Sequence, residues 1–312
     1  MVGLDEVELL EAPPQERLTP ADAEIEAAAK AVADADNPII YAGSGVHLSQ
    51  AYDAVREISD DFNIPVRTTA AGKGIIPDDH PLHLTTAGMA MLTKGGLPDP
   101  DLVLAVGTRN ALGMFSESTS IIQIDVDADE IGRFHKNTTP LVGDARETLL
   151  KLHAALGETD ASSRPSPADA VANVREFLAR PEHLTEPQES FNNAVRAGIP
   201  KDGIAIYGMT QLGYYGRTNY KTYMPRTYID SGYSGNLGFA YPTALGAKLA
   251  KPDVPVICVT GDGGFGYQSP EMATAMKYGI NVVTVLFNDN SYGNVARDLD
   301  MDFGGQYEVE LH

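Results

Sequence analysis

Two acidic residues follow strand-like runs of the chain and are the first candidates for chemistry. Asp262 follows the run 256–260 and lies among three glycines, and Asp289 follows the run 282–287. One helical segment and one apolar run separate the two acids, which is about the length of a crossover between neighbouring parallel strands. Ligands bind at the carboxyl edge of such sheets, so both acids are expected to meet at a binding edge.

Glycine and acid residues in this arrangement have a specific chemistry. Gly261, Gly263 and Gly264 allow close approach of the backbone to a ligand and expose N–H groups to an anion. Mg²⁺ prefers oxygen ligands and often bridges a protein to phosphate. The pattern therefore predicts a site for Mg²⁺ and a diphosphate. The alternative is an ordinary glycine turn followed by an asparagine-rich loop, and spacing alone leaves both interpretations open.

The elements that position these residues have an α/β pattern. Apolar strands alternate with amphipathic helices, which predicts parallel, doubly wound sheets. In the first domain, residues 19–156, we expect strands within 37–46, 64–70, 100–108 and 121–128, and helices within 21–35, 51–62 and 145–156. In the second domain, residues 187–312, we expect strands within 202–208, 226–232, 254–264 and 281–289, and helices within 241–250 and 269–279.

The remaining segments have the composition of linkers. Residues 1–18 are acidic, contain proline and show no clear period. Residues 157–186 begin with a stretch rich in serine, proline and alanine, and hold one short helix within 171–183. Both segments are therefore predicted to connect domains.

Composition narrows the classes of partner. The formal net charge is −20 and the pI about 4.6, which disfavours binding to nucleic acid or to anionic membranes. No run of 18 apolar residues occurs, so no membrane span is expected. The N-terminal residues have neither a basic nor an apolar region of the signal-peptide type. The single cysteine, Cys258, lies in an apolar run and is expected to be a buried core residue. A cytoplasmic location fits these features.

Several other residues leave two interpretations open. The glycines of 43–45 follow a strand and could form a nucleotide-binding loop, but a plain strand-to-helix turn is favoured because the third glycine is missing. His80 and His83 could resemble metal ligands, although loop anchoring is favoured. An aromatic-rich loop is expected to pack in the core or at an interface rather than on a substrate; its tyrosines are Tyr214, Tyr215, Tyr220 and Tyr223.

The segment from Leu245 to Gly264 resembles the signature of thiamine-diphosphate enzymes. It has a small residue after an apolar one, then Pro252, then alternating apolar residues that lead into Gly-Asp-Gly. The resemblance continues through residues 287–295, and residues 232–250 look like the segment that receives the aminopyrimidine ring. The first domain resembles the central domain of the acetolactate synthase and benzoylformate decarboxylase group at residues 37–46, 70–83, 100–109 and 121–132.

This resemblance implies roles for named residues. Asp262 and Asp289 would be Mg²⁺ ligands, with the backbone carbonyl of Ser291 as the third. Asp289 departs from the family, which usually has asparagine at that position, and so adds a negative charge. The residues implied to bind the cofactor are Gly235, Asn236, Leu237, Gly261, Asp262, Gly263, Gly264, Asp289, Ser291, Tyr292 and Gly293.

Individual contacts follow from the same resemblance. Gly263 and Gly264 would offer N–H groups to the diphosphate. Leu237 would wedge the cofactor into a bent shape, and the carbonyl of Gly235 would accept a hydrogen bond from the 4′-amino group. That bend brings the amino group close to the reactive thiazolium carbon, which makes proton removal intramolecular.

The implied activity is decarboxylation of a 2-oxo acid with carboligation, as in acetolactate synthases. A simple decarboxylase of the benzoylformate type is the alternative, and a chain that binds the cofactor or a partner without turnover is another. Some relatives bind FAD through the central domain, and Arg109 is the residue to watch for that cofactor.

The family normally has an N-terminal pyrimidine-binding domain, which carries the activating glutamate. That domain is expected to be absent here, and the diphosphate-binding domain to be truncated at its C-terminus, so no catalytic residue is assigned. A homo-oligomer, or another chain that supplies the pyrimidine-binding domain, is expected as partner.

Overall fold

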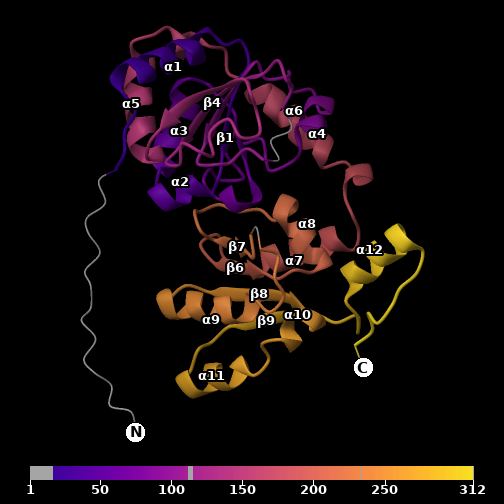
Figure 1. Cartoon of the computed structure of the whole chain (residues 1–312). Coiled ribbons are helices and arrows are strands. Elements are labelled where there is room, and N and C mark those ends of the chain that lie inside the picture. Colours follow the sequence, from indigo (N-terminus) through magenta and orange to yellow (C-terminus); the bar gives the residue numbers. More distant parts are fainter. Residues whose placement is uncertain (1–16, 112–114, 233, 312) are drawn as a thin grey trace, which may run out of the picture.

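The chain forms two parallel-sheet α/β domains, as the sequence predicts. The computed structural model describes residues 17–111, 115–232 and 234–311. The first domain and the second lie one against the other (Figure 1). The predicted linker 1–18 falls almost entirely outside the described residues.

The first domain is built on a five-stranded parallel sheet with the strand order β2-β1-β3-β4-β5. Its strands are β1 (Pro38–Ala42), β2 (Val66–Thr68), β3 (Leu102–Val106), β4 (Ser120–Asp125) and β5 (Thr138–Val142). All residues of β1 and β3 are buried, which explains their continuous apolar sequence. Strand β5 was not predicted, because it is short, half exposed and contains a proline.

Helices cover both faces of this sheet. One face packs against α1 (Asp22–Asp34), α3 (Tyr52–Asp61) and α5 (Ala145–Gly157). The other face packs against α4 (Met89–Lys94) and α6 (Ala168–Leu178). The short elements between them are α2 (Ser44–Ser49), η1 (Ala70–Gly72), η2 (Ala161–Ser163) and η3 (Pro181–His183).

Helix α6 lies within residues 157–186, the segment with linker composition. Its Val171 and Val174 are fully buried in the same apolar cluster as Leu92 and Val103 of the first domain. These contacts make α6 part of the second covering layer of the first sheet.

The second domain is built on a four-stranded parallel sheet with the order β7-β6-β8-β9. Its strands are β6 (Ile204–Tyr207), β7 (Tyr228–Asp230), β8 (Val256–Gly261) and β9 (Val283–Phe287). Its helices are α7 (Gln188–Ala197), α8 (Gln211–Asn219), α9 (Ala240–Ala250), α10 (Asp262–Gly266), α11 (Glu271–Tyr278) and α12 (Gly293–Phe303).

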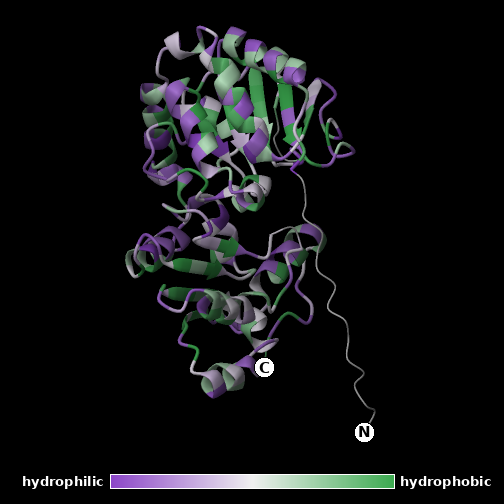
Figure 2. Ribbon diagram, turned by 90° about the vertical axis from the view of Figure 1, so that its left-hand side faces the viewer, coloured by the Kyte–Doolittle hydropathy of each residue, from purple (hydrophilic) through white to green (hydrophobic). Residues whose placement is uncertain are grey.

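The central strands of the second sheet are apolar on both faces. One face packs against α7 and α8, and the other against α9. Figure 2 shows the hydrophobic strands of both domains between more polar helices. Cys258 lies in β8, is fully buried, and has a pKa that burial raises to about 12, as expected of a core residue.

Direct hydrogen bonds join the two domains. The Asp78 carboxylate accepts from the backbone N–H of Thr222 at 2.6 Å and from its hydroxyl at 3.0 Å. The N–H of Asp78 donates to the carbonyl of Thr222 at 2.8 Å. Thr222 is only 1% exposed, so these bonds satisfy polar groups that water does not reach.

No helix in the described part of the chain combines the length and apolar character needed to cross a membrane.

We expect Asp78→Ala to lower the free energy of unfolding by about 1–3 kcal/mol, because it leaves a buried N–H and hydroxyl of Thr222 without an acceptor. Urea unfolding followed by circular dichroism measures this. The control is Asp79→Ala, which removes only an exposed ion pair with Lys201 and is expected to have a smaller effect. Equal losses in both variants would contradict the importance of the Asp78 bonds.

Candidate functional site

Parallel pairing of β8 with β9 brings the two candidate acids to one edge of the second sheet. The register pairs Gly261 with Phe287, the last residues of the two strands. Asp262 follows Gly261 directly as the first residue of α10, and Asp289 lies two residues beyond Phe287. Both acids therefore sit at the carboxyl ends of neighbouring strands.

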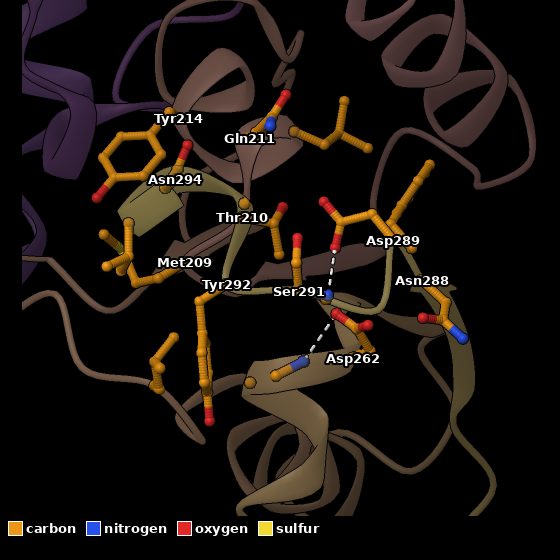
Figure 3. A pocket seen from close by; sticks show the side chains of 18 of the residues that line it. Met209, Thr210, Gln211, Tyr214, Asp262, Asn288, Asp289, Ser291, Tyr292 and Asn294 are labelled. Carbon is orange, nitrogen blue, oxygen red and sulfur yellow. Dashed lines mark hydrogen bonds between the residues drawn. The ribbon is translucent and has the colours of Figure 1, made fainter. Parts of the chain in front are cut away.

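A pocket of about 510 Å³ opens at this edge. All but one of the predicted cofactor residues line it: Gly235, Leu237, Gly261, Asp262, Gly263, Gly264, Asp289, Ser291, Tyr292 and Gly293. Asn236 is not among the lining residues. Figure 3 shows Asp262, Asp289 and Ser291 together along one side of the pocket.

The carboxylate of Asp262 is only partly satisfied. Its Oδ1 accepts a hydrogen bond from the N–H of Gly263 at 2.8 Å, whereas its Oδ2 is buried without a hydrogen-bond partner among the described residues. Asp289 Oδ1 accepts from the N–H of Ser291 at 3.3 Å. A buried carboxylate oxygen without a donor is costly, and a hard cation would supply what it lacks. The donor set therefore fits Mg²⁺.

The charged side chains that line the pocket are all acidic. Asp262 and Asp289 are its only charged residues, since no lysine or arginine is among the lining residues that the structure describes. The described residues also hold no group of three or more His, Cys, Asp or Glu side chains that could bind a metal ion by themselves. An anion in this pocket therefore has no side-chain cation to bind.

Two of the glycines are required by close contacts. A Cβ on Gly263 would lie 2.7 Å from the ring of Tyr292, and a Cβ on Gly293 would lie 2.6 Å from Asp289 Oδ2. Larger residues at either position would displace a side chain of the pocket. Both glycines thus shape this edge of the sheet.

The loop between β7 and α9 forms a second wall. Gly235 has a φ of 58°, and both Gly235 and Leu237 line the pocket. The Leu237 side chain lies 3.9 Å from the position of a Cβ on Gly264, so it closes over the glycine turn.

The third wall was not predicted as part of a site. Residues 211–219 form helix α8, whereas the sequence analysis placed Tyr214 and Tyr215 in an aromatic-rich loop, which is wrong. The start of α8 and the two residues before it contribute Met209, Thr210, Gln211, Leu212 and Tyr214 to the pocket, and the start of α7 contributes Gln188 and Phe191. The glycines in 211–219 weaken the helical pattern, but Thr210 is a cap signal that could have located the helix.

The four tyrosines have separate surroundings. Tyr220 is fully buried in the core of the second domain. Tyr215 donates to Glu189 at 2.6 Å, and Tyr223 lies under Lys201. Tyr214 lines the pocket. Tyr220 therefore packs in the core as expected, whereas Tyr214 is accessible to a ligand in the pocket.

A backbone strap supports the loop that holds Asp289. The N–H of Tyr292 donates to the carbonyl of Val309 at 2.8 Å, and the N–H of Leu311 donates to the carbonyl of Asn290 at 2.7 Å. These bonds form an antiparallel bridge between Ser291 and Glu310. The strap fixes the backbone around the Ser291 carbonyl.

Other candidate residues have structural explanations. His80 lies 3.0 Å from Asp60, and His83 is buried with a pKa that burial lowers to about 4, consistent with loop anchoring. Gly43 and Gly45 pack against Gly107, whose carbonyl would lie 2.6 Å from a Cβ on Gly43. Close packing of the turn between β1 and α2 against the residue that follows β3 therefore accounts for these glycines.

Comparison with known proteins agrees with this geometry. Residues 25–152 match the central domain of thiamine pyrophosphate enzymes, and residues 208–311 match their C-terminal TPP-binding domain. The chain belongs to the thiamine pyrophosphate enzyme family. The second match covers all three walls of the pocket apart from its residues on and near α7.

Three relatives in the thiamine pyrophosphate enzyme family indicate the range of similarity. A probable acetolactate synthase large subunit of Methanocaldococcus jannaschii is 32% identical over 93% of this chain and 52% of its own length. An acetolactate synthase large subunit of Corynebacterium glutamicum is 32% identical over 93% of this chain and 48% of its own length. A probable 2-ketoarginine decarboxylase of Pseudomonas aeruginosa is 32% identical over 91% of this chain and 51% of its own length. The chain thus spans about half the length of these relatives.

We expect Thr210→Ala to lower the free energy of unfolding by about 1 kcal/mol, because the Thr210 hydroxyl caps α8. In the structure it accepts from the N–H of Gly213 at 3.0 Å. Urea unfolding checks the change, and Thr210→Ser is the matched control because serine keeps the capping hydroxyl. Similar losses in both variants would contradict the capping role.

Proposed function

We propose that this chain provides the cofactor-binding part of a thiamine-diphosphate- and Mg²⁺-dependent enzyme that decarboxylates a 2-oxo acid and then ligates a second carbonyl compound. The observation that carries the proposal is the unpartnered, buried Oδ2 of Asp262 at a glycine turn in the pocket. The relatives named as acetolactate synthases support the carboligation step.

Different residues of the pocket would bind the metal ion and the diphosphate. The carboxylates of Asp262 and Asp289 and the carbonyl of Ser291 would hold Mg²⁺. The N–H groups of Gly263 and Gly264 would donate to the diphosphate. Gly261, Tyr292 and Gly293 would bound the space around it.

The wall between β7 and α9 would orient the cofactor. Leu237 would support its bent shape, and the Gly235 carbonyl would accept a hydrogen bond from the aminopyrimidine. Asn236, which does not line the pocket, would act through the backbone of this loop. When bound, thiamine diphosphate supplies an electron sink for the loss of CO₂ from a 2-oxo acid.

A simple decarboxylase is the second candidate, supported by the relative named as a probable 2-ketoarginine decarboxylase. The two functions differ in product, because carboligation yields a condensed product and simple decarboxylation yields only an aldehyde and CO₂. Release of CO₂ above background would exclude a third possibility, a chain that binds without turnover.

We also propose that the activating glutamate comes from a pyrimidine-binding domain, either in a second copy within a homo-oligomer or in another chain. Two of the relatives are named as large subunits, which supports a multi-chain assembly. The free, buried thiol of Cys258 is compatible with a reducing, cytoplasmic location.

We expect the 312-residue chain to bind thiamine diphosphate in the presence of Mg²⁺ and not in EDTA, as measured by calorimetric titration. Asp262→Ala should abolish the Mg²⁺-dependent binding, because it removes the buried Oδ2 atom that has no hydrogen-bond partner among the described residues. Asp298→Ala, which changes an exposed acid outside the pocket, is the control and should bind normally. Unchanged binding in Asp262→Ala would refute the metal assignment.

We expect Asp289→Asn to keep Mg²⁺-dependent binding, because the amide oxygen of asparagine is also a hard ligand. The same titration measures it, with Asp289→Ala as the variant that offers no ligand oxygen. Complete loss of binding in Asp289→Asn would tell against Asp289 as the second ligand.

A further inference from the structure

Arg217 lies in the last turn of α8, outside the lining of the pocket, yet it contacts two of the pocket walls. Its Nε donates to Asp230 Oδ2 at 2.7 Å, and its Nη2 donates to the carbonyl of Gly232 at 2.8 Å. The Asp230 side chain is 8% exposed, so this ion pair is largely shielded from water. Such a pair fixes geometry more strongly than an exposed one.

The segment that Arg217 holds is the loop between β7 and α9. Gly232, Gly235 and Gly238 in this loop all have positive φ values, between 57° and 79°. Glycine backbones lose much conformational entropy when ordered, so the position of such a loop depends on its anchors. The anchors at its start are the two Arg217 bonds and a bond from the N–H of Gly232 to Asp230 Oδ1 at 2.8 Å.

Arg217 also reaches the opposite wall. Its Nη2 lies 3.8 Å from the sulfur of Met209, and its guanidinium carbon lies 5.8 Å from the ring centre of Tyr214. Met209 and Tyr214 both line the pocket, and Figure 3 shows them on the side of α8. One guanidinium therefore sets the spacing between the start of α8 and the loop that carries Gly235 and Leu237.

The first domain holds the end of α8 in place. The hydroxyl of Thr86 donates to the carbonyls of Arg217 at 3.3 Å and Thr218 at 2.9 Å. The buried ammonium of Lys73, also in the first domain, lies 5.7 Å from the ring centre of Tyr228 in β7. Both elements that Arg217 connects are thus braced by the neighbouring domain.

We propose that Arg217 is a positioning residue for the thiamine diphosphate site, which acts through Asp230 and Gly232 to hold the loop of Gly235 and Leu237 at its distance from Met209. This inference rests on the proposed function of the pocket. It assigns to a residue without cofactor contact a direct influence on cofactor affinity. The competing explanation is an ion pair that only stabilises the second domain.

Calorimetric titration with thiamine diphosphate in excess MgCl₂ tests the proposal on the 312-residue chain. Arg217→Met should raise the dissociation constant about tenfold, in line with other supporting residues of ligand sites. Asp230→Asn should weaken binding in the same direction. The double variant should bind within about twofold of Arg217→Met, because the two residues act through one interaction.

Arg196→Met is the matched control. Arg196 lies in α7 of the same domain and donates to the carbonyls of Ile199 and Pro200, but it has no hydrogen bond to the described residues of the loop between β7 and α9. Its loss should lower stability while the dissociation constant stays within about twofold of wild type. Arg217→Lys should recover part of the affinity, because lysine keeps the ion pair but not the forked hydrogen bonds.

Hydrogen exchange of the cofactor-free chain separates this inference from the proposed function. The backbone amides of residues 234–238 should exchange faster in Arg217→Met than in the wild-type chain. Their exchange rates in Arg196→Met should equal those of the wild-type chain. Unaltered affinity in Arg217→Met, or equal weakening in Arg196→Met, would overturn the positioning role. A folded wild-type chain that binds no cofactor would instead contradict the proposed function for this chain, and exchange alone would then decide whether Arg217 orders the loop.

Discussion

The parallel pairing of β8 with β9 is the constraint on which the candidate site depends. Because Gly261 pairs with Phe287, the residues that follow each strand leave the sheet at the same edge. A parallel pair needs a crossover, and α10 and α11 form the crossover between β8 and β9 that places Asp262 and Asp289 at this edge. A shift of this register would move one acid relative to the other and reverse the face of every β9 side chain.

The second feature that shapes the candidate site is the position of its backbone. A Cβ on Gly263 would displace the Tyr292 ring and a Cβ on Gly293 would displace the Asp289 carboxylate, so the backbone at both glycines lies close to side chains of the pocket. The strap formed by Val309 and Leu311 holds the same loop through main-chain hydrogen bonds. Atoms of the backbone, which sequence motifs only imply through glycine, therefore help to shape this edge of the pocket.

The sequence predicted the two walls that lie in continuous motifs and missed the one that does not. Strands β8 and β9 and the loop of Gly235 appear as apolar runs and glycines within one stretch of the chain. The wall of Met209 and α8 comes from an earlier segment with no recognisable period, because glycines interrupt the helical pattern of α8. Likewise, no local signal shows that Arg217 meets Asp230, since that contact depends on tertiary packing of α8 against the end of β7.

The electrostatics of the pocket explain why a divalent cation belongs to the proposed site. Its described lining contains two carboxylates and no lysine or arginine, within a chain of net charge −20. A diphosphate close to Asp262 and Asp289 would meet repulsion that two or three N–H groups only partly offset. In the proposed site, a Mg²⁺ ion held by the carboxylates would offset that repulsion and would also give the unpartnered Oδ2 of Asp262 a ligand bond. The same carboxylates that would repel the anion alone would then hold it through the metal, so the proposal makes affinity for the cofactor depend on Mg²⁺.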